Sequence, residues 1–293
     1  MTRSPTHGRG VLLLAGASLC WSLAGILVRL LDAGDWTIVF WRSVFMSLTL
    51  LGLLAVWTRG RPGLAFRLAG WKGVLSGAFM ACAFICFILS ITRTTVANTL
   101  VLMASAPFFS AITGRILLGE RLAPPAWAAM VAAVAGIALM FAGELGPGEF
   151  IGNLLALAVA LSFAGNIVVL KRAGEANMVP AVILGGVFSA IIALPLAEPL
   201  VVSPGAFGIL LVLGAVQLGL GLTFYVFGAR HLPAAEVSLM GLLETVLSPL
   251  WVWIFIAERP TDLALAGGTL VILSLAALAL FGGRRTHLPV GVA

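Results

Sequence analysis

Residues 239–259 read LMGLLETVLSPLWVWIFIAER, an apolar stretch long enough to cross a membrane as one helix. One acid, Glu244, lies among its leucines. A charged residue at the centre of a bilayer costs about 2.5 kcal/mol or more, so an interaction inside the protein must offset that cost. Glu236, Met240 and Ser248 recur at four-residue spacing with this acid and share its side of the helix. We expect that side to face the protein interior or a hydrated cavity.

The role of Glu244 has two interpretations. In the first, its carboxylate binds a substrate amine or carries a proton. In the second, it is a structural group, protonated or capping a neighbouring helix, that bonds near the backbone groups freed by Pro249. Burial in a membrane favours the neutral acid, so the sequence leaves both interpretations open.

The whole chain shares the apolar character of this stretch. Of its 293 residues, 61% are hydrophobic and 10% are charged, and the mean hydropathy is +1.14. Such values are typical of a membrane protein, and the lack of alternating polarity favours helices over a barrel. The net charge of +6 comes from short clusters between apolar segments, which argues against nucleic-acid binding. Ten spans are predicted: 11–31, 36–57, 71–92, 96–118, 124–143, 150–170, 178–197, 205–229, 234–257 and 262–282.

The basic residues predict the orientation of these spans. With the N-terminus in the cytoplasm, most of the 17 Lys and Arg residues fall on the cytoplasmic side. Both termini are therefore predicted to be cytoplasmic. The N-terminal apolar run continues to Leu31, so we interpret it as a retained helix and not as a cleaved signal peptide. The loops are short, the longest being TRGRPGLAFRLAG.

The stretch quoted first has a counterpart in the other half of the chain. Thr94–Arg121, TTVANTLVLMASAPFFSAITGRILLGER, aligns without a gap with Leu232–Arg259. The chain is thus predicted to consist of two five-helix repeats, residues 1–145 and 146–293. Because five is odd, the second repeat enters the membrane upside down. Inverted repeats of this kind are typical of secondary transporters that work by alternating access.

Three residues inside the spans are unusual for membrane helices. Pro107 and Pro249 each remove a backbone hydrogen bond, so each is expected to kink its helix. Arg42 is the one basic residue embedded in a span. It could pair with a buried acid or a substrate carboxylate, but we favour snorkelling of its side chain to the membrane interface.

Small polar and aromatic residues recur at helical spacing in six of the ten spans. Taken singly, each fits helix packing or an interhelical hydrogen bond, and only the set predicts a central cavity. The residues predicted to bind substrate are Ser18, Trp21, Ser22, Phe79, Cys82, Asn98, Ser105, Phe163, Asn166, Gln217, Tyr225 and Glu244. The stripe of Ala128, Ala132 and Gly136 fits close helix packing or the face of a homodimer equally well.

Signatures of enzymes and ATPases are absent from the sequence. His7, His231 and His287 lie at a terminus or at helix edges, and no Walker motif is present. The three cysteines lie inside apolar spans and are expected to act as packing residues. We therefore predict no cofactor, no bound metal and no enzymatic activity. A channel is disfavoured because an inverted repeat indicates two alternating states.

The two halves resemble the EamA branch of the drug/metabolite transporter superfamily. The matching stretches are GVLLLAGASLCWSLAGILVR, FWRSVF with Arg42, APFFSAITGRILLGERL, and LLETVLSPLWVWIFIAER. Within the branch, the chain looks most like bacterial YddG-type exporters of aromatic amino acids. The family commonly has Pro directly after the acid at Glu244, whereas this chain has Thr245.

This resemblance implies a multi-pass protein of the bacterial inner membrane, with ten helices around a central cavity, that exports small metabolites. Aromatic or hydrophobic amino acids are the expected cargo, with Asn98, Asn166, Gln217 or Glu244 meeting the zwitterion. The alternative is export of drugs or other cationic compounds by the same fold. Nucleotide-linked sugars fit less well, because Arg42 is the one embedded cation. A membrane-embedded enzyme is the distant alternative.

Overall fold

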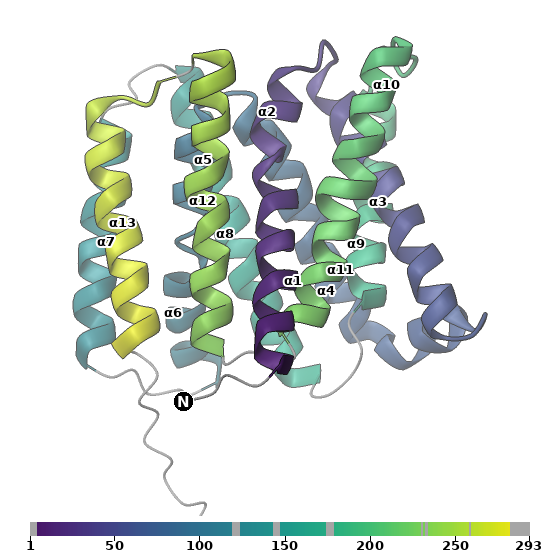
Figure 1. Ribbon diagram of the computed structural model, residues 1–293, viewed down its shortest axis with the longest axis horizontal. Helices are drawn as coiled ribbons and strands as arrows, with labels where there is room; N and C mark the ends of the chain where they lie inside the picture. The colour runs from purple at the N-terminus through teal and green to yellow at the C-terminus, as the bar shows by residue number, and fades with distance from the viewer. Residues whose placement is uncertain are drawn as a thin grey trace, which may run out of the picture.

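The computed structural model describes residues 5–118, 124–142, 147–173, 179–229, 231, 234–257 and 259–281, and over these residues the fold is entirely helical. The helices stand side by side as a bundle, and α1 begins on the same side on which α13 ends (Figure 1). The elements are α1 (Pro5–Ser22), α2 (Ala24–Arg29), α3 (Asp35–Trp57), α4 (Pro62–Ile91), α5 (Val96–Met103), α6 (Ala106–Leu118), α7 (Pro124–Ala142), α8 (Pro147–Ala173), α9 (Val179–Ala193), the 3₁₀ turn η1 (Leu194–Leu196), α10 (Pro204–Leu211), the π-helix η2 (Val212–Leu220), α11 (Gly221–Ala229), α12 (Ala234–Ile256) and α13 (Asp262–Phe281).

Each of the ten predicted windows contains helix. Among the described residues, seven helical stretches are long and apolar enough to cross a membrane. They are His7–Arg29, Asp35–Trp57, Pro62–Ile91, Val96–Leu117, Gly148–Leu170, Val179–Leu196 and Pro204–Ala229. Two shorter apolar stretches, Leu243–Ile256 and Asp262–Ser274, follow near the C-terminal end. A helix satisfies its own backbone hydrogen bonds, which is why apolar runs of this length take this form in a bilayer.

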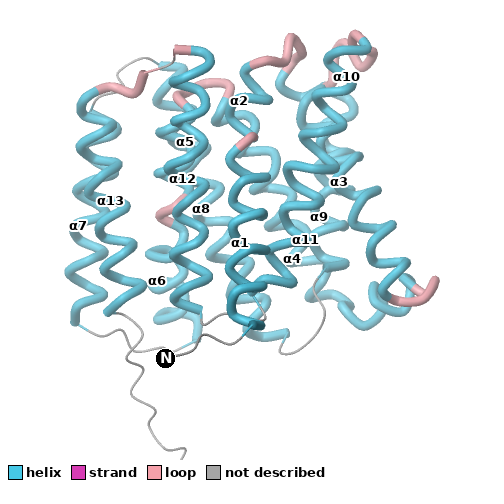
Figure 2. Tube along the Cα trace, in the orientation of Figure 1, coloured by secondary structure: helices cyan, strands magenta, loops and turns pink. Residues whose placement is uncertain are grey.

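Several of the long stretches are irregular, and Figure 2 shows the interruptions between α1 and α2 and between α5 and α6. The first is interrupted at Leu23, between α1 and α2, where the sequence predicts one continuous span. The predicted break of the fourth span is confirmed, because α5 ends at Met103 and α6 begins at Ala106, next to Pro107. The stretch Pro204–Ala229 contains the nine-residue π-helix η2. In contrast, α12 continues through Pro249.

The longest predicted loop is wrong in its second half. TRGRPGLAFRLAG covers residues 58–70, but helix α4 already begins at Pro62. Proline suits the first turn of a helix, where its missing N–H is not needed. Ala65 and Ala69 are buried on one side of this short segment. Gly70 then adopts φ 53° and ψ −151°, so the chain changes direction before the rest of α4.

Gly70→Ala is expected to destabilise the protein. Its backbone angles are essentially restricted to glycine, and a Cβ there costs about 1–3 kcal/mol. No atom lies within 4 Å of that Cβ, so strain alone is tested. Gly63→Ala, also in α4 and equally open, is the control. Thermal unfolding of the purified protein in detergent measures both. Equal melting temperatures for the two variants would contradict the assignment of strain.

The bundle is held together by apolar side chains and by close helix contacts. Met46 and Ile88 are fully buried in the largest core cluster, between α3, α4 and their neighbours. Gly136 of α7 packs against α13, because a Cβ at this position would lie 2.7 Å from the carbonyl oxygen of Gly267. Of the two interpretations of the Ala128–Gly136 stripe, packing within one chain therefore applies at Gly136.

Candidate functional site

The interrupted helix α1–α2 makes polar contacts with two elements of the second half of the chain, α12 and η2. Two residues of its predicted polar stripe attach it to α12. The hydroxyl of Ser18 donates to the carbonyl oxygen of Met240 at 2.8 Å, and the indole N–H of Trp251 donates to Ser22 Oγ at 3.1 Å. Ser18 and Ser22 are buried, so these contacts join the two halves of the chain inside the bundle.

The π-helix η2 contacts the other side of α1. Gln217, which is 2% exposed, donates through Nε2 to the carbonyl oxygen of Trp21 at 3.4 Å. A π-helix widens the backbone and re-aims its side chains, and such segments are frequent at functional sites. The Trp21 ring also packs against Tyr225 of α11, with 5.4 Å between ring centroids. The indole N–H of Trp21 has no hydrogen-bond partner among the described residues.

Arg42 of α3 reaches into the same region, and the prediction that it snorkels to the interface is wrong. The residue is 4% exposed. Its Nη2 lies 3.5 Å from Gln217 Oε1, a long contact. Its guanidinium carbon lies 6.0 Å and 5.1 Å from the ring centroids of Phe84 and Phe87, both on α4. Cation–π contacts and the amide thus hold the charge inside the bundle, where the π-helix supplies the polar partner.

Glu244 supplies the opposite charge from α12. It is half-buried and interacts electrostatically with Arg42. No direct ion pair joins the two side chains in the part of the chain that the structure describes. We name Trp21, Arg42, Gln217, Tyr225 and Glu244 the central cluster. One charge comes from residues 1–145 and the other from residues 146–293, so this cluster lies where the predicted repeats meet.

The structure does not bring the remaining predicted residues into the central cluster. Asn166 accepts a hydrogen bond from Ser76, and Phe79 packs against Gly165, so both lie at the contact between α4 and α8. Cys82 Sγ lies 3.9 Å from Cys86 Sγ. At 100° per residue, Cys82 faces away from the side of α4 that carries Phe84 and Phe87. Ser105 bonds the carbonyl oxygen of Leu102, and Phe163 packs against the largest core cluster.

The model of the EamA-like transporter family matches residues 8–142 and again residues 150–280. The chain belongs to this family. It is therefore a transporter and not an enzyme, and a multi-pass protein of the bacterial inner membrane. The pseudopaline exporter CntI of Pseudomonas aeruginosa, from strains UCBPP-PA14 and PAO1, is 27% identical over 283 residues, which cover 92% of this chain and 95% of the relative. A solved crystal structure aligns with a TM-score of 0.66 at 18% identity, over 95% of this chain and 100% of the other.

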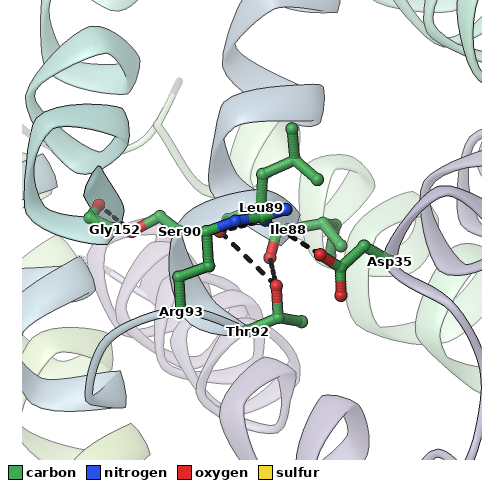
Figure 3. A network of polar contacts seen from close by, with 7 residues as sticks. All are labelled: Asp35, Ile88, Leu89, Ser90, Thr92, Arg93 and Gly152. Atoms are coloured by element: carbon green, nitrogen blue, oxygen red, sulfur yellow. Dashed lines mark hydrogen bonds and ion pairs between the residues drawn. The ribbon is translucent and has the colours of Figure 1, made fainter. Parts of the chain in front are cut away.

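A second polar network of this EamA-like transporter lies at one end of the bundle and includes Asn98. Arg93 forms an ion pair with Asp35 at 2.8 Å and also donates to the carbonyl oxygen of Leu89 (Figure 3). Ser90 donates to the carbonyl oxygen of Gly152 of α8 at 2.8 Å (Figure 3). Asn98 contacts Thr94 Oγ1, which bonds Asn153. These contacts tie α3, α4, α5 and α8 together and place Asn98 in a structural network.

The transporter also contains a shallow, open apolar depression between α3, α9 and α11. Its lining residues are Leu50, Trp57, Val179, Val182, Leu222, Thr223 and Val226. None of the twelve predicted binding residues belongs to this lining. The depression is too small to hold a metabolite, and no charged side chain lines it.

Proposed function

We propose that this EamA-like transporter exports small metabolites, and specifically amino acids with aromatic or hydrophobic side chains. The central cluster carries the proposal. It brings a cation and an acid from the two halves of the chain into electrostatic contact, and Gln217 connects the cation to Trp21, whose ring packs against Tyr225. Opposite charges beside an aromatic surface suit a zwitterion with an apolar side chain. The relative's name, a pseudopaline exporter, supports export of a metabolite.

The same proposal includes the transport mechanism. Ten membrane spans in two inverted five-helix repeats, with both termini in the cytoplasm, would alternate between inward-open and outward-open arrangements around the central cluster. The family model matches once in each half, and interrupted helices lie next to the cluster at Leu23 and in η2. Irregular backbone at membrane depth is tolerated where it lies within protein or lines a hydrated path, which supports this location for the site.

Counterflow tests the cargo. In proteoliposomes loaded with unlabelled phenylalanine, labelled phenylalanine is expected to accumulate above its equilibrium level without any ion gradient. Tryptophan should compete for this flux more strongly than threonine, because its ring contacts the aromatic pair. Liposomes without protein are the control. If none of these amino acids exchanges, the amino-acid cargo is overturned and cationic compounds become the next candidates.

A further inference from the structure

Arg42 has too few partners for a buried guanidinium. Its Nε has no hydrogen-bond partner among the described residues, and the contact with Gln217 is 3.5 Å long. Transfer of a cation out of water is costly unless charge-assisted hydrogen bonds replace the hydration. A carboxylate can satisfy a guanidinium with two parallel hydrogen bonds, whereas the amide and the phenyl rings around Arg42 cannot. The guanidinium of Arg42 therefore has hydrogen-bond donors that a carboxylate could pair with.

Glu244 does not fill this capacity. It interacts with Arg42 electrostatically without a direct ion pair. With Glu244 ionised, the charges of Arg42 and Glu244 offset one another. A bound anion would leave the site with net negative charge, and a bound amine would leave it with net positive charge. In a medium of low dielectric constant, either excess is expensive, so a ligand of zero net charge is preferred.

We infer that the site binds zwitterions in one orientation, with the carboxylate on Arg42 and the ammonium group on Glu244. This inference rests on the proposed function and deepens it. The ligand then separates the two charges and pairs with each of them, so binding replaces one indirect interaction by two direct ones. Gln217 holds the guanidinium from the side of η2, and the ring pair of Trp21 and Tyr225 accepts the apolar part of the ligand.

The orientation predicts a crossed pattern of ligand discrimination. Phenylalaninamide lacks the carboxylate of phenylalanine, and 3-phenylpropionate lacks its ammonium group. Equilibrium binding to the purified protein in nanodiscs is expected to weaken at least tenfold when either group is lost, because a charge-assisted pair is lost with it. In Arg42→Gln, the preference for phenylalanine over phenylalaninamide should fall to within about threefold, while the preference over 3-phenylpropionate remains. In Glu244→Gln, the preference for phenylalanine over 3-phenylpropionate should fall in the same way, while the preference over phenylalaninamide remains.

Matched variants keep the test decisive. Arg42→Lys and Glu244→Asp retain the charges and provide folded forms if the glutamine variants do not fold. Arg42→Lys should weaken the binding of phenylalanine more than the binding of phenylalaninamide, because Lys cannot form the two parallel hydrogen bonds with a carboxylate. Arg93→Gln, at the end of the bundle, should leave both preferences unchanged.

Unchanged preferences in all Arg42 and Glu244 variants would overturn the orientation while leaving amino-acid export intact. If carnitine or glycine betaine binds in a way that depends on both Arg42 and Glu244, but no amino acid binds, the zwitterion site is supported and the proposed cargo is overturned. Absence of binding by every zwitterion would overturn both.

Discussion

Glu244→Gln is expected to destabilise the protein by about 1–3 kcal/mol, the largest loss of any conservative change in the central cluster. The reason lies in its partner. Arg42 is 4% exposed and cannot release its proton, so it would stay charged and buried without a counter-charge. Arg42→Gln should cost less, because the half-buried Glu244 can take up a proton and become neutral. The free energy of unfolding, measured by titration with SDS in mixed micelles, gives both values.

A double variant separates charge from packing. In Arg42→Gln/Glu244→Gln, neither charge remains, so part of the stability lost in Glu244→Gln should return, while phenylalanine binding stays weak. Replacing two buried opposite charges together is often neutral, whereas removing one of them leaves the other without compensation. Additive losses in the double variant would contradict an energetic link between the two residues. Arg93→Gln/Asp35→Asn, in the half-exposed ion pair at the bundle end, is the control and should change stability by at most about 1 kcal/mol.

Composition and spacing were sufficient to predict the helices and one contact between the two halves of the chain. Apolar runs of membrane length predict a helix over each of the ten windows, because only a helix satisfies the backbone there. The four-residue spacing of Ser18 and Ser22 predicts that they share a side, and both bond α12. The same reasoning predicts a buried position for Gln217, which is buried against α1, whereas Tyr225 is exposed although its ring packs against Trp21.

Other features depend on contacts that no local pattern encodes. The buried position of Arg42 requires Gln217 of η2 and the rings of Phe84 and Phe87 of α4, which approach it from two separate parts of the chain. The π-helix η2 has no signature in VLGAVQLGL, which reads as an ordinary apolar helix. Phe79 of α4 and Asn166 of α8 were interpreted as cavity lining, but they contact Gly165 and Ser76 where these two helices pack against each other. Spacing predicts that residues share a face but not which neighbour that face meets.

Gly214→Leu is expected to prevent correct packing of η2 against α3, with a loss of at least about 3 kcal/mol. A Cβ at this position would lie 2.6 Å from both the carbonyl oxygen of Arg42 and the Cβ of Phe45. Both are fixed parts of α3 and not the ends of flexible side chains, so the helices themselves must separate. The change would also move Gln217 away from the guanidinium, so phenylalanine binding should fall together with the melting temperature.

Gly208→Leu is the matched control for this change. It lies in α10 on the same helical stretch, is exposed, and has no atom within 4 Å of its Cβ position. A leucine facing lipid there should leave both binding and melting temperature within error. If Gly214→Leu behaves like this control, η2 does not pack closely against α3, and the assignment of Gln217 as the residue that holds Arg42 fails with it. If Gly214→Leu melts early and loses binding, the close approach of these two backbones is what positions the cation, because one small residue in the π-helix allows the contact between Arg42 and Gln217.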